Sequence, residues 1–247
     1  MTSAPPTVLL VGAGPGAPDL LTLDAERALA AARLVVADRA LAPLLATLVA
    51  GPRVVWVDDD QPAGGAILSA LALHPADRVV RLYRGDPWFH PGGDADRAAL
   101  RGAGAAWTSL PGVVPEIAAL AEAGIPVQLR TSSVTTTFVV DGPTAELELP
   151  ADPAHALVVR TADLAATVRR LADPVAAADY PERAARAAAV VGDHGIGAGR
   201  SGPTVVRTTV GALATAAAGL TGAGVVVVGL VAVLDTRSGA PGRRVEP

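Results

Sequence analysis

The chain has 247 residues, of which 51% are hydrophobic and 18% are charged, and its formal net charge is −4 at pH 7. This apolar fraction is large enough for a folded core, which excludes the disordered and fibrous classes. The sequence contains no cysteine, so disulfide frameworks, thiol nucleophiles and iron–sulfur or zinc–thiolate sites are excluded. All 20 basic residues are arginine, and the absence of lysine excludes Schiff-base chemistry and the Walker phosphate site.

The charge balance and one long uncharged stretch bear on partners and location. A mildly acidic chain argues against non-specific binding to nucleic acid. No charge occurs between Arg207 and Asp235, which is long enough to cross a membrane, but three glycines between positions 219 and 224 interrupt it. We therefore expect a helix over Val210–Leu220 and a buried strand over Val225–Leu234. The N-terminal residues do not form a signal peptide pattern, so we expect a soluble cytoplasmic protein with no membrane segment and no metal site.

Short apolar runs alternate with helical patterns in the first half of the chain, an order typical of an α/β fold with a parallel sheet. Thr22 is the expected N-cap of the first helix. The expected strands are Thr7–Val11, Leu34–Ala37, Arg53–Val57, Arg78–Tyr83 and Ala105–Leu110, and the expected helices are Leu20–Ala32, Ile67–Leu73 and Ala95–Arg101.

The pattern restarts at Pro111-Gly112. A second series of elements follows, so the sequence predicts two α/β domains, residues 1–111 and 112–247. We expect the tail after Asp235 to be loosely ordered. The expected strands of the second domain are Thr135–Val140, His155–Arg160 and Ala187–Val191, and its helices are Glu116–Ala123 and Leu164–Leu171.

A glycine-rich loop, Gly12-Ala13-Gly14-Pro15-Gly16-Ala17, follows the first predicted strand. Glycines let the backbone turn sharply and approach a ligand closely. Together with Asp38 at the end of the second strand, the spacing fits a dinucleotide-binding fingerprint. Pro15, however, has no amide hydrogen to donate to a pyrophosphate. A nucleotide-binding Rossmann protein and a simple structural turn both remain alternatives at this point.

A second loop, Arg84-Gly85-Asp86-Pro87-Trp88-Phe89, follows another buried strand. It lies at a carboxyl end of the predicted sheet, where ligands bind in α/β proteins. Asp86 could hold ribose hydroxyls, and Trp88 or Phe89 could cover an apolar ligand face. Alternatively, Asp86 accepts hydrogen bonds from backbone amides in a turn.

Together, these motifs resemble those of the tetrapyrrole methylase family. The resemblance runs in one order from Thr7 to Leu234. It comprises the family patterns G-A-G-P-G-D-P-x-L-L-T at Gly12–Thr22, V-V-Y-D-R-L at Val35–Leu41, V-V-R-L-K-G-G-D-P at Val79–Pro87, the P-G helix and A-G-I-P turn at Pro111–Pro126, and V-V-V-G-x-V-V-x-L at Val226–Leu234.

The resemblance implies a C-methyltransferase that uses S-adenosylmethionine and acts on uroporphyrinogen III or a related tetrapyrrole of a sirohaem- or cobalamin-type pathway. It also implies a homodimer, with the cofactor in a cleft between two α/β domains. Asp38 falls at the position of the catalytic acid/base, where a carboxylate guides a proton; otherwise it pairs with Arg39 or caps a helix. The implied cofactor contacts are Pro15, Gly85, Asp86, Phe89, Val114, Pro115, Arg160 and Thr208.

A porphyrinogen carries many carboxylates, which arginine pairs with bidentately. The candidate partners are Arg39, Arg81, Arg84 and Arg130. The alternative for each is an arginine exposed to solvent, which is common for this residue type.

The chain also departs from the family pattern at several positions. Tyr83-Arg84 replaces Lys-Gly, and Asp58–Asp60 stands where the family has a basic segment. Val114-Pro115 replaces a pair of small residues, and Arg160 replaces a methionine. Taken over the whole chain, the motifs on the cofactor side are mostly kept, whereas those on the substrate side are largely lost. These departures favour, as the alternative, a relative that binds cofactor or ligand without methylating a tetrapyrrole.

Overall fold

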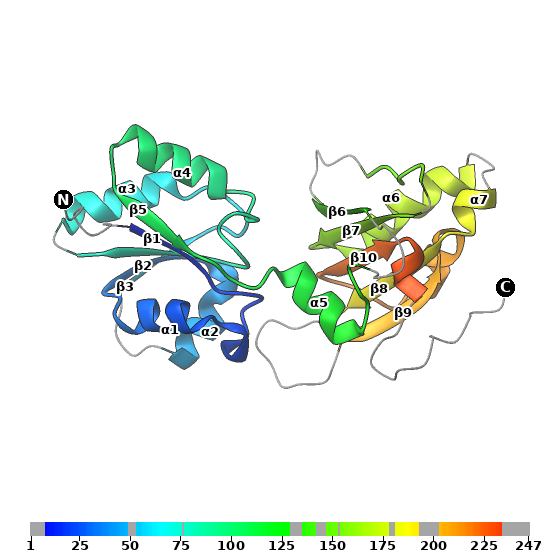
Figure 1. The fold of residues 1–247 in the computed structure, drawn as a ribbon, viewed down its shortest axis with the longest axis horizontal. Coiled ribbons are helices and arrows are strands. Elements are labelled where there is room, and N and C mark those ends of the chain that lie inside the picture. Colours follow the sequence, from blue (N-terminus) through cyan, green and yellow to red (C-terminus); the bar gives the residue numbers. More distant parts are fainter. Residues whose placement is uncertain are drawn as a thin grey trace. The chain divides into compact units, whose positions relative to one another are not determined.

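The computed structural model describes residues 8–48, 53–75, 77–128, 135–141, 147–152, 154–177, 181–192 and 203–233. The chain divides into two compact units, one ending at Pro115 and one beginning at Glu116. Each is built around its own five-stranded sheet, which confirms the predicted two-domain α/β fold (Figure 1). Within the described ranges, no helix is long and apolar enough to cross a membrane.

The first unit contains a wholly parallel sheet with the strand order β3-β2-β4-β1-β5. The three central strands β2, β4 and β1 are buried along their whole length, as their continuous apolar sequences predict. The strands are β1 (Val8–Gly12), β2 (Leu34–Asp38), β3 (Arg53–Val57), β4 (Val79–Tyr83) and β5 (Trp107–Leu110).

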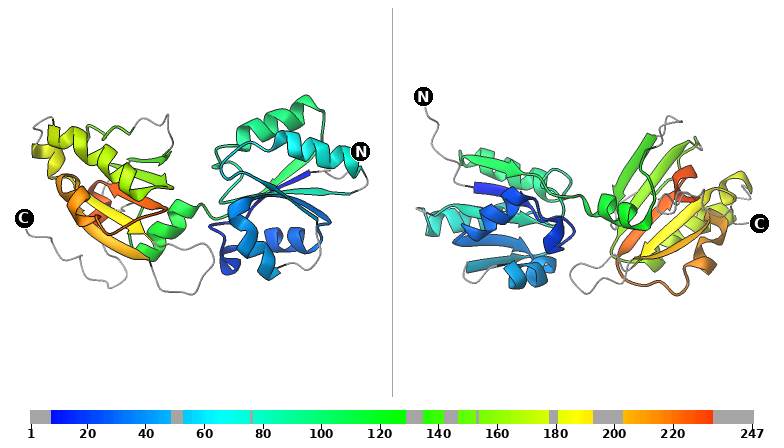
Figure 2. Two further views of the ribbon diagram at one scale, coloured as in Figure 1. Left: turned by 180° about the vertical axis from the view of Figure 1, so that it is seen from behind. Right: turned by 60° about the horizontal axis from the view of Figure 1, so that its bottom comes forward.

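Helices cover both faces of this sheet (Figures 1 and 2). One face packs against α1 (Leu23–Ala30) and α2 (Ala42–Leu48), and the other against α3 (Gly64–Leu73) and α4 (Gly93–Gly102). The hydroxyl oxygen of Thr22 accepts a hydrogen bond from the Ala25 amide at 3.2 Å, which confirms the predicted N-cap. The short helix α2 was not predicted. Two 3₁₀ turns, η1 (Pro18–Leu20) and η2 (Arg39–Leu41), complete the connections.

The second unit contains a mixed sheet with the order β6-β7-β10-β8-β9, in which only β6 and β7 pair in parallel. Helix α5 packs on one face, and α6 and α8 pack on the other. The elements are α5 (Pro115–Ala123), β6 (Thr135–Val140), β7 (His155–Thr161), α6 (Leu164–Ala177), α7 (Pro181–Ala184), β8 (Ala187–Gly192), β9 (Thr204–Thr209), η3 (Val210–Ala212), α8 (Leu213–Ala216), β10 (Gly224–Val228) and η4 (Leu230–Val233).

The C-terminal elements are shorter than the sequence predicts. The expected strand over Val225–Leu234 ends at Val228, and the expected helix over Val210–Leu220 ends at Ala216. The strand stops because Gly229 adopts a φ of 129°, outside the range of extended backbone, and a 3₁₀ turn follows. The sequence analysis also missed β9, which pairs antiparallel with β8 at the edge of the sheet. The tail after Asp235 lies outside the described residues.

Candidate functional site

Three loops of the first unit meet at the carboxyl ends of β1, β4 and β5. Gly85 donates its N–H to the carbonyl of Gly14 at 2.7 Å, and Gly14 donates to the carbonyl of Gly85 at 3.1 Å. A Cβ on Gly112 would lie 2.2 Å from the Gly85 oxygen, and a Cβ on Gly12 would lie 2.5 Å from that same atom. The loops therefore pack backbone against backbone, in space that no side chain can enter.

Asp86 holds two of these loops together. Its Oδ1 accepts from the Trp88 amide at 2.8 Å, and its Oδ2 accepts from the Gly112 amide at 3.0 Å. The side chain is buried, and both oxygens are already engaged by the backbone. This geometry agrees with the turn-forming alternative for Asp86, so the carboxylate shapes the loops from inside.

Two aromatic side chains stand out from the loop that follows Asp86. Trp88 is 59% exposed and Phe89 is 57% exposed. Trp88 is held in place because its Nε1 donates to Ser109 at 3.1 Å and the guanidinium of Arg97 lies 4.2 Å from its ring centroid. The loop thus presents an ordered apolar surface suited to a flat ligand. This surface lies beside the glycine junction, the close contact of Gly12, Gly85 and Gly112.

A buried network of charges lies next to these loops and begins at Arg81 on β4. Nη2 of Arg81 lies 2.7 Å from Oδ1 of Asp38, and its Nε lies 3.2 Å from Oδ2 of Asp96 on α4. The hydroxyl of Tyr83 also donates to Asp96, at 2.9 Å. All four side chains are completely buried, and charges survive such burial only when they are paired.

Asp38 has two further neighbours. Its Oδ2 accepts from the backbone amide of Arg84 at 2.8 Å and lies 3.0 Å from Nε2 of His90, at an angle too bent for a regular hydrogen bond. Burial by itself would raise the pKa of the Asp38 carboxyl, but His90, Arg81 and the Arg84 amide outweigh it and hold that pKa below its ordinary value. Asp38 is therefore an anion in the folded protein.

The network reaches the surface through His90, Asp60 and Arg84. Nδ1 of His90 accepts from the Gly92 amide at 3.0 Å, and its Nε2 lies 3.8 Å from Oδ1 of Asp60. Asp60 in turn pairs with Nη2 of Arg84 at 3.2 Å. The sequence showed His90 and Asp96 only as part of a segment that departs from the family pattern and assigned them no role, because only the folded sheet brings them to Asp38 and Arg81. Asp60 had one signal, as an acid in a segment where the family has basic residues.

The arginines expected to bind substrate fall into three groups. Arg81 departs from the expectation, because it is fully buried and its guanidinium already pairs with two carboxylates of the chain. Arg39 is exposed and lies next to Asp38 at the start of η2, whereas the guanidinium of Arg84 pairs with Asp60. Arg130 lies outside the described residues.

Asp38 neither caps η2 nor has Arg39 as its partner, so both alternatives for Asp38 are set aside.

The expected cofactor contacts are divided between the units. Pro15, Gly85, Asp86 and Phe89 belong to the three-loop region of the first unit, and Val114 and Pro115 end that unit. In the second unit, Nε of Arg160 lies 2.7 Å from Oε1 of Glu116 at the start of α5. Strand alternation places Thr208 on the opposite face, toward α6 and α8. Arg160 and Thr208 therefore do not face a common surface of the sheet.

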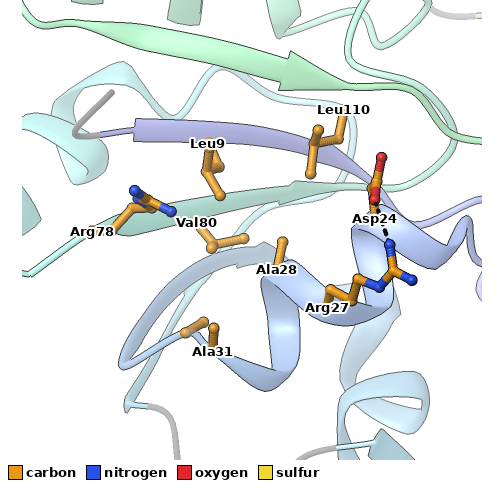
Figure 3. A pocket seen from close by; sticks show the side chains of 9 residues that line it. Leu9, Asp24, Arg27, Ala28, Ala31, Arg78, Val80 and Leu110 are labelled. Atoms are coloured by element: carbon orange, nitrogen blue, oxygen red, sulfur yellow. Dashed lines mark hydrogen bonds and ion pairs between the residues drawn. The ribbon is translucent and has the colours of Figure 1, made fainter. Parts of the chain in front are cut away.

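A hollow of about 530 Å³ also lies in the first unit, between α1 and strands β1, β4 and β5 (Figure 3). Leu9, Val80 and Leu110 form its apolar wall, opposite alanines of α1. The hollow lies along the sheet face toward α1.

Among the described residues, no group of three or more His, Asp or Glu side chains is arranged to hold a metal ion.

Comparison with known proteins identifies the class to which this fold and these loops belong. The model of the tetrapyrrole (corrin/porphyrin) methylases matches residues 7–214, so the chain belongs to this family. Siroheme synthase 1 of Aeromonas salmonicida is 35% identical over 161 residues, which cover 60% of this chain and 34% of that protein. A siroheme synthase of Chromobacterium violaceum is 38% identical over 140 residues, covering 53% of this chain and 30% of that protein. The chain thus matches about a third of the length of these curated relatives.

Solved structures agree with this assignment. Uroporphyrin-III C-methyltransferase of Thermus thermophilus is 30% identical with a TM-score of 0.70, and the match covers 91% of this chain and 92% of that one. A structure of the Thermus thermophilus enzyme with S-adenosylhomocysteine is 27% identical, with a TM-score of 0.66 and coverage of 91% and 97%. A cobalt precorrin-4 methyltransferase shares the fold at 22% identity and a TM-score of 0.72, covering 92% and 96%. S-adenosylmethionine is the methyl donor of the family.

Replacing Arg81 with methionine should destabilise the protein strongly. Arg81→Met leaves the carboxylates of Asp38 and Asp96 buried without their common cation, which costs about 3–5 kcal/mol. Urea denaturation measures the loss. Arg78→Met, at an exposed position just before β4, is the control and should stay within about 0.5 kcal/mol of the wild type. Equal stability of the two variants would contradict the role of Arg81.

The lowered pKa of Asp38 predicts a particular acid sensitivity. Because its folded-state pKa lies below the ordinary value of 3.8, its stabilising contribution is complete above that pH and is lost as the pH falls through the folded pKa. The free energy of unfolding of the wild type should therefore fall more steeply below about pH 4 than that of Asp38→Asn, by up to about 1.4 kcal/mol per pH unit. Urea titrations at a series of pH values measure both slopes, and parallel slopes would refute this role of Asp38.

Proposed function

We propose that the chain is a C-methyltransferase that transfers the methyl group of S-adenosylmethionine to uroporphyrinogen III or a closely related tetrapyrrole. The observation that carries this proposal is the glycine junction of the first unit, formed by Gly12, Gly85 and Gly112 beside the exposed Phe89. Glycine loops of this kind allow a ligand to approach the backbone closely at the carboxyl edge of a parallel sheet. Similarity to uroporphyrin-III C-methyltransferase and the siroheme synthases supports the choice of substrate.

The residues of the loops suit S-adenosylmethionine. When bound, the cofactor supplies a methyl group on a positively charged sulfonium. Asp86 keeps the two loops at their spacing through Trp88 and Gly112, so backbone groups rather than this carboxylate are available to a ligand. We infer that Pro15, Gly85, Val114 and Pro115 line the cofactor site, with Phe89 against its apolar part. Arg160 and Thr208 belong to the second unit, and their part in cofactor binding rests on the family resemblance alone.

The substrate side of the proposal rests on arginines that directly follow strands of the first sheet. A porphyrinogen presents many carboxylates, and guanidinium groups bind carboxylates in pairs of parallel hydrogen bonds. Arg39 and Arg84 lie near the carboxyl ends of β2 and β4, so we propose that they bind these carboxylates, together with Arg130. Asp38 is completely buried, so we propose that it positions the loop of Arg84 and leaves contact with the reacting atoms to other groups. A homodimer and a cytoplasmic location complete the proposal and rest on the family resemblance alone.

A relative that binds the cofactor without methylating a tetrapyrrole is the second candidate. The acid at position 60 favours it, because Asp60 pairs with Arg84 and so competes with a substrate carboxylate for this guanidinium. The two candidates differ in turnover but share the cofactor. Transfer of a labelled methyl group from S-adenosylmethionine to uroporphyrinogen III distinguishes them.

Calorimetric titration tests the cofactor. S-adenosylhomocysteine should bind with a Kd on the order of micromolar, about −8 kcal/mol, because the loops are already formed in the free protein. NAD and NADP serve as controls, since a Rossmann-type nucleotide site would bind one of them. Binding of a dinucleotide without binding of S-adenosylhomocysteine would refute both candidates.

Asp86 should matter for cofactor binding although both its oxygens are engaged by the backbone. Asp86→Ala removes two charge-assisted hydrogen bonds and frees the loops to separate, so affinity for S-adenosylhomocysteine should fall by at least tenfold, since one such bond contributes about 1.5–3 kcal/mol. Asp19→Ala, an exposed acid in η1, is the matched control and should change the Kd less than about twofold. Similar Kd values for the two variants would remove Asp86 from the cofactor site.

A further inference from the structure

Arg84 is held at two points at the carboxyl end of β4. Its backbone amide donates to Oδ2 of Asp38 at 2.8 Å, and Nη2 of its guanidinium pairs with Oδ2 of Asp60 at 3.2 Å. The side chain of Arg84 is 17% exposed. The guanidinium therefore has a defined position at the edge of the sheet where we place the substrate.

Asp60 uses only part of what this guanidinium can donate. A guanidinium carries several N–H groups, and a carboxylate that binds it bidentately accepts from a parallel pair of them. Asp60 contacts Nη2 alone, and Nε of Arg84 is buried with no hydrogen-bond partner among the described residues. Arg84 therefore keeps N–H groups for a further acceptor, which would lie directly beside the carboxylate of Asp60.

Asp60 is held in a turn that keeps its carboxylate at Arg84. Its φ of 59° makes it the one non-glycine residue of the described part of the chain in the left-handed region, a conformation that surrounding contacts must maintain. Oδ1 of Asp60 lies 3.8 Å from Nε2 of the buried His90. The neighbouring Asp59 ties the turn to η2, because its Oδ1 accepts from the Ala40 amide at 2.8 Å. A ligand at this edge thus meets a fixed anion next to Arg84.

Acidic side chains outnumber basic ones in the segments that surround this ion pair. Asp58, Asp59 and Asp60 directly follow β3, whereas the cations that directly follow β2 and β4 are Arg39 and Arg84. A substrate carboxylate that binds Arg84 therefore enters a region that already holds an excess of negative charge. Like charges placed side by side are unfavourable, so the edge favours a substrate that brings few carboxylates to it.

Porphyrinogens differ in how their carboxylates are grouped. In uroporphyrinogen III every pyrrole ring carries an acetate and a propionate on neighbouring carbons, so the carboxylates reach a protein in pairs. Where methyl groups replace the acetates, a ring carries a single carboxylate. One such carboxylate can share Arg84 with Asp60, whereas the second member of a pair would meet the charge of Asp60 without a cation of its own.

We propose that Asp60 is a specificity-determining residue that takes, on Arg84, the place of one of two neighbouring substrate carboxylates, an inference that rests on the proposed function. The pyrrole ring that lies at this edge then carries one carboxylate. The substrate class that this geometry selects is a porphyrinogen with methyl groups in place of acetates, in preference to uroporphyrinogen III. Asp60 discriminates at the binding step, through the charge that it places beside Arg84.

Methyl transfer to two porphyrinogens tests the preference. The probes are uroporphyrinogen III and coproporphyrinogen III, in which a methyl group replaces each acetate. We expect kcat/KM of the wild type, measured as transfer of labelled methyl, to be at least about tenfold higher for coproporphyrinogen III, with the difference residing in KM. A wild type that prefers uroporphyrinogen III would overturn the inference.

Asparagine at position 60 tests the residue itself. Asp60→Asn removes the charge and tolerates the same backbone conformation, so the turn is preserved. It should raise kcat/KM for uroporphyrinogen III at least about tenfold and leave that for coproporphyrinogen III within about threefold, because only the ring with two carboxylates is repelled. Asp58→Asn removes an equal charge at an exposed position of the same turn and should leave the ratio of the two kcat/KM values within about twofold. An equal shift in both variants would show an effect of net charge alone and would overturn the role of Asp60.

A second variant guards against a folding defect. Asp60→Gly also lacks the carboxylate, glycine adopts a φ of 59° without strain, and the preference should shift in the same direction. The Kd for S-adenosylhomocysteine should stay within about twofold of the wild type in both Asp60 variants, because neither change touches the glycine junction. A wild type that binds S-adenosylhomocysteine but methylates neither porphyrinogen would overturn the proposed function. An active wild type whose preference is unchanged in Asp60→Asn and Asp60→Gly would overturn this inference alone.

Discussion

Arg81 is the interaction on which the first unit depends. Its guanidinium is completely buried and joins the end of β2, through Asp38, to helix α4, through Asp96. A guanidinium without these partners would be prohibitively costly at a fully buried position, and each carboxylate would be equally costly without Arg81. One cation between two anions therefore fixes the geometry at the carboxyl edge of the sheet. The loops that follow β2 and β4 are held in position by these ion pairs.

The two ends of this network have different surroundings. Asp38 binds Arg81, contacts His90 and accepts from the Arg84 amide, and its pKa is lowered as a result. A carboxylate engaged in this way stabilises the loop that follows β4. Asp60 lies at the partly exposed end of the same network, where it pairs with Arg84 at 3.2 Å. The network thus offers a rigid buried anion and an accessible one, with a histidine between them.

The glycine junction meets a different requirement, that of close approach. Gly12, Gly85 and Gly112 come from three loops far apart in the sequence and meet at distances that a Cβ would not allow. Asp86 reinforces the junction with two hydrogen bonds to backbone amides. The buried carboxylate of Asp86 thus maintains the conformation of the loop, and the backbone of that loop is the part that a ligand would contact.

The sequence by itself determined the α/β class, the continuous apolar strands of the first sheet, the Thr22 cap and the glycine loops. These features depend on local propensity or on residue types at short spacing, which a single sequence displays directly. Only the tertiary structure decided that Arg81 is an internal ion-pair partner, that Arg160 and Thr208 lie on opposite faces, and that His90 and Asp60 join Asp38. Gly229 ended a strand that its valines would have continued. In each of these cases the deciding contact joins residues distant in the sequence or depends on a backbone angle, and neither is visible in the order of side chains.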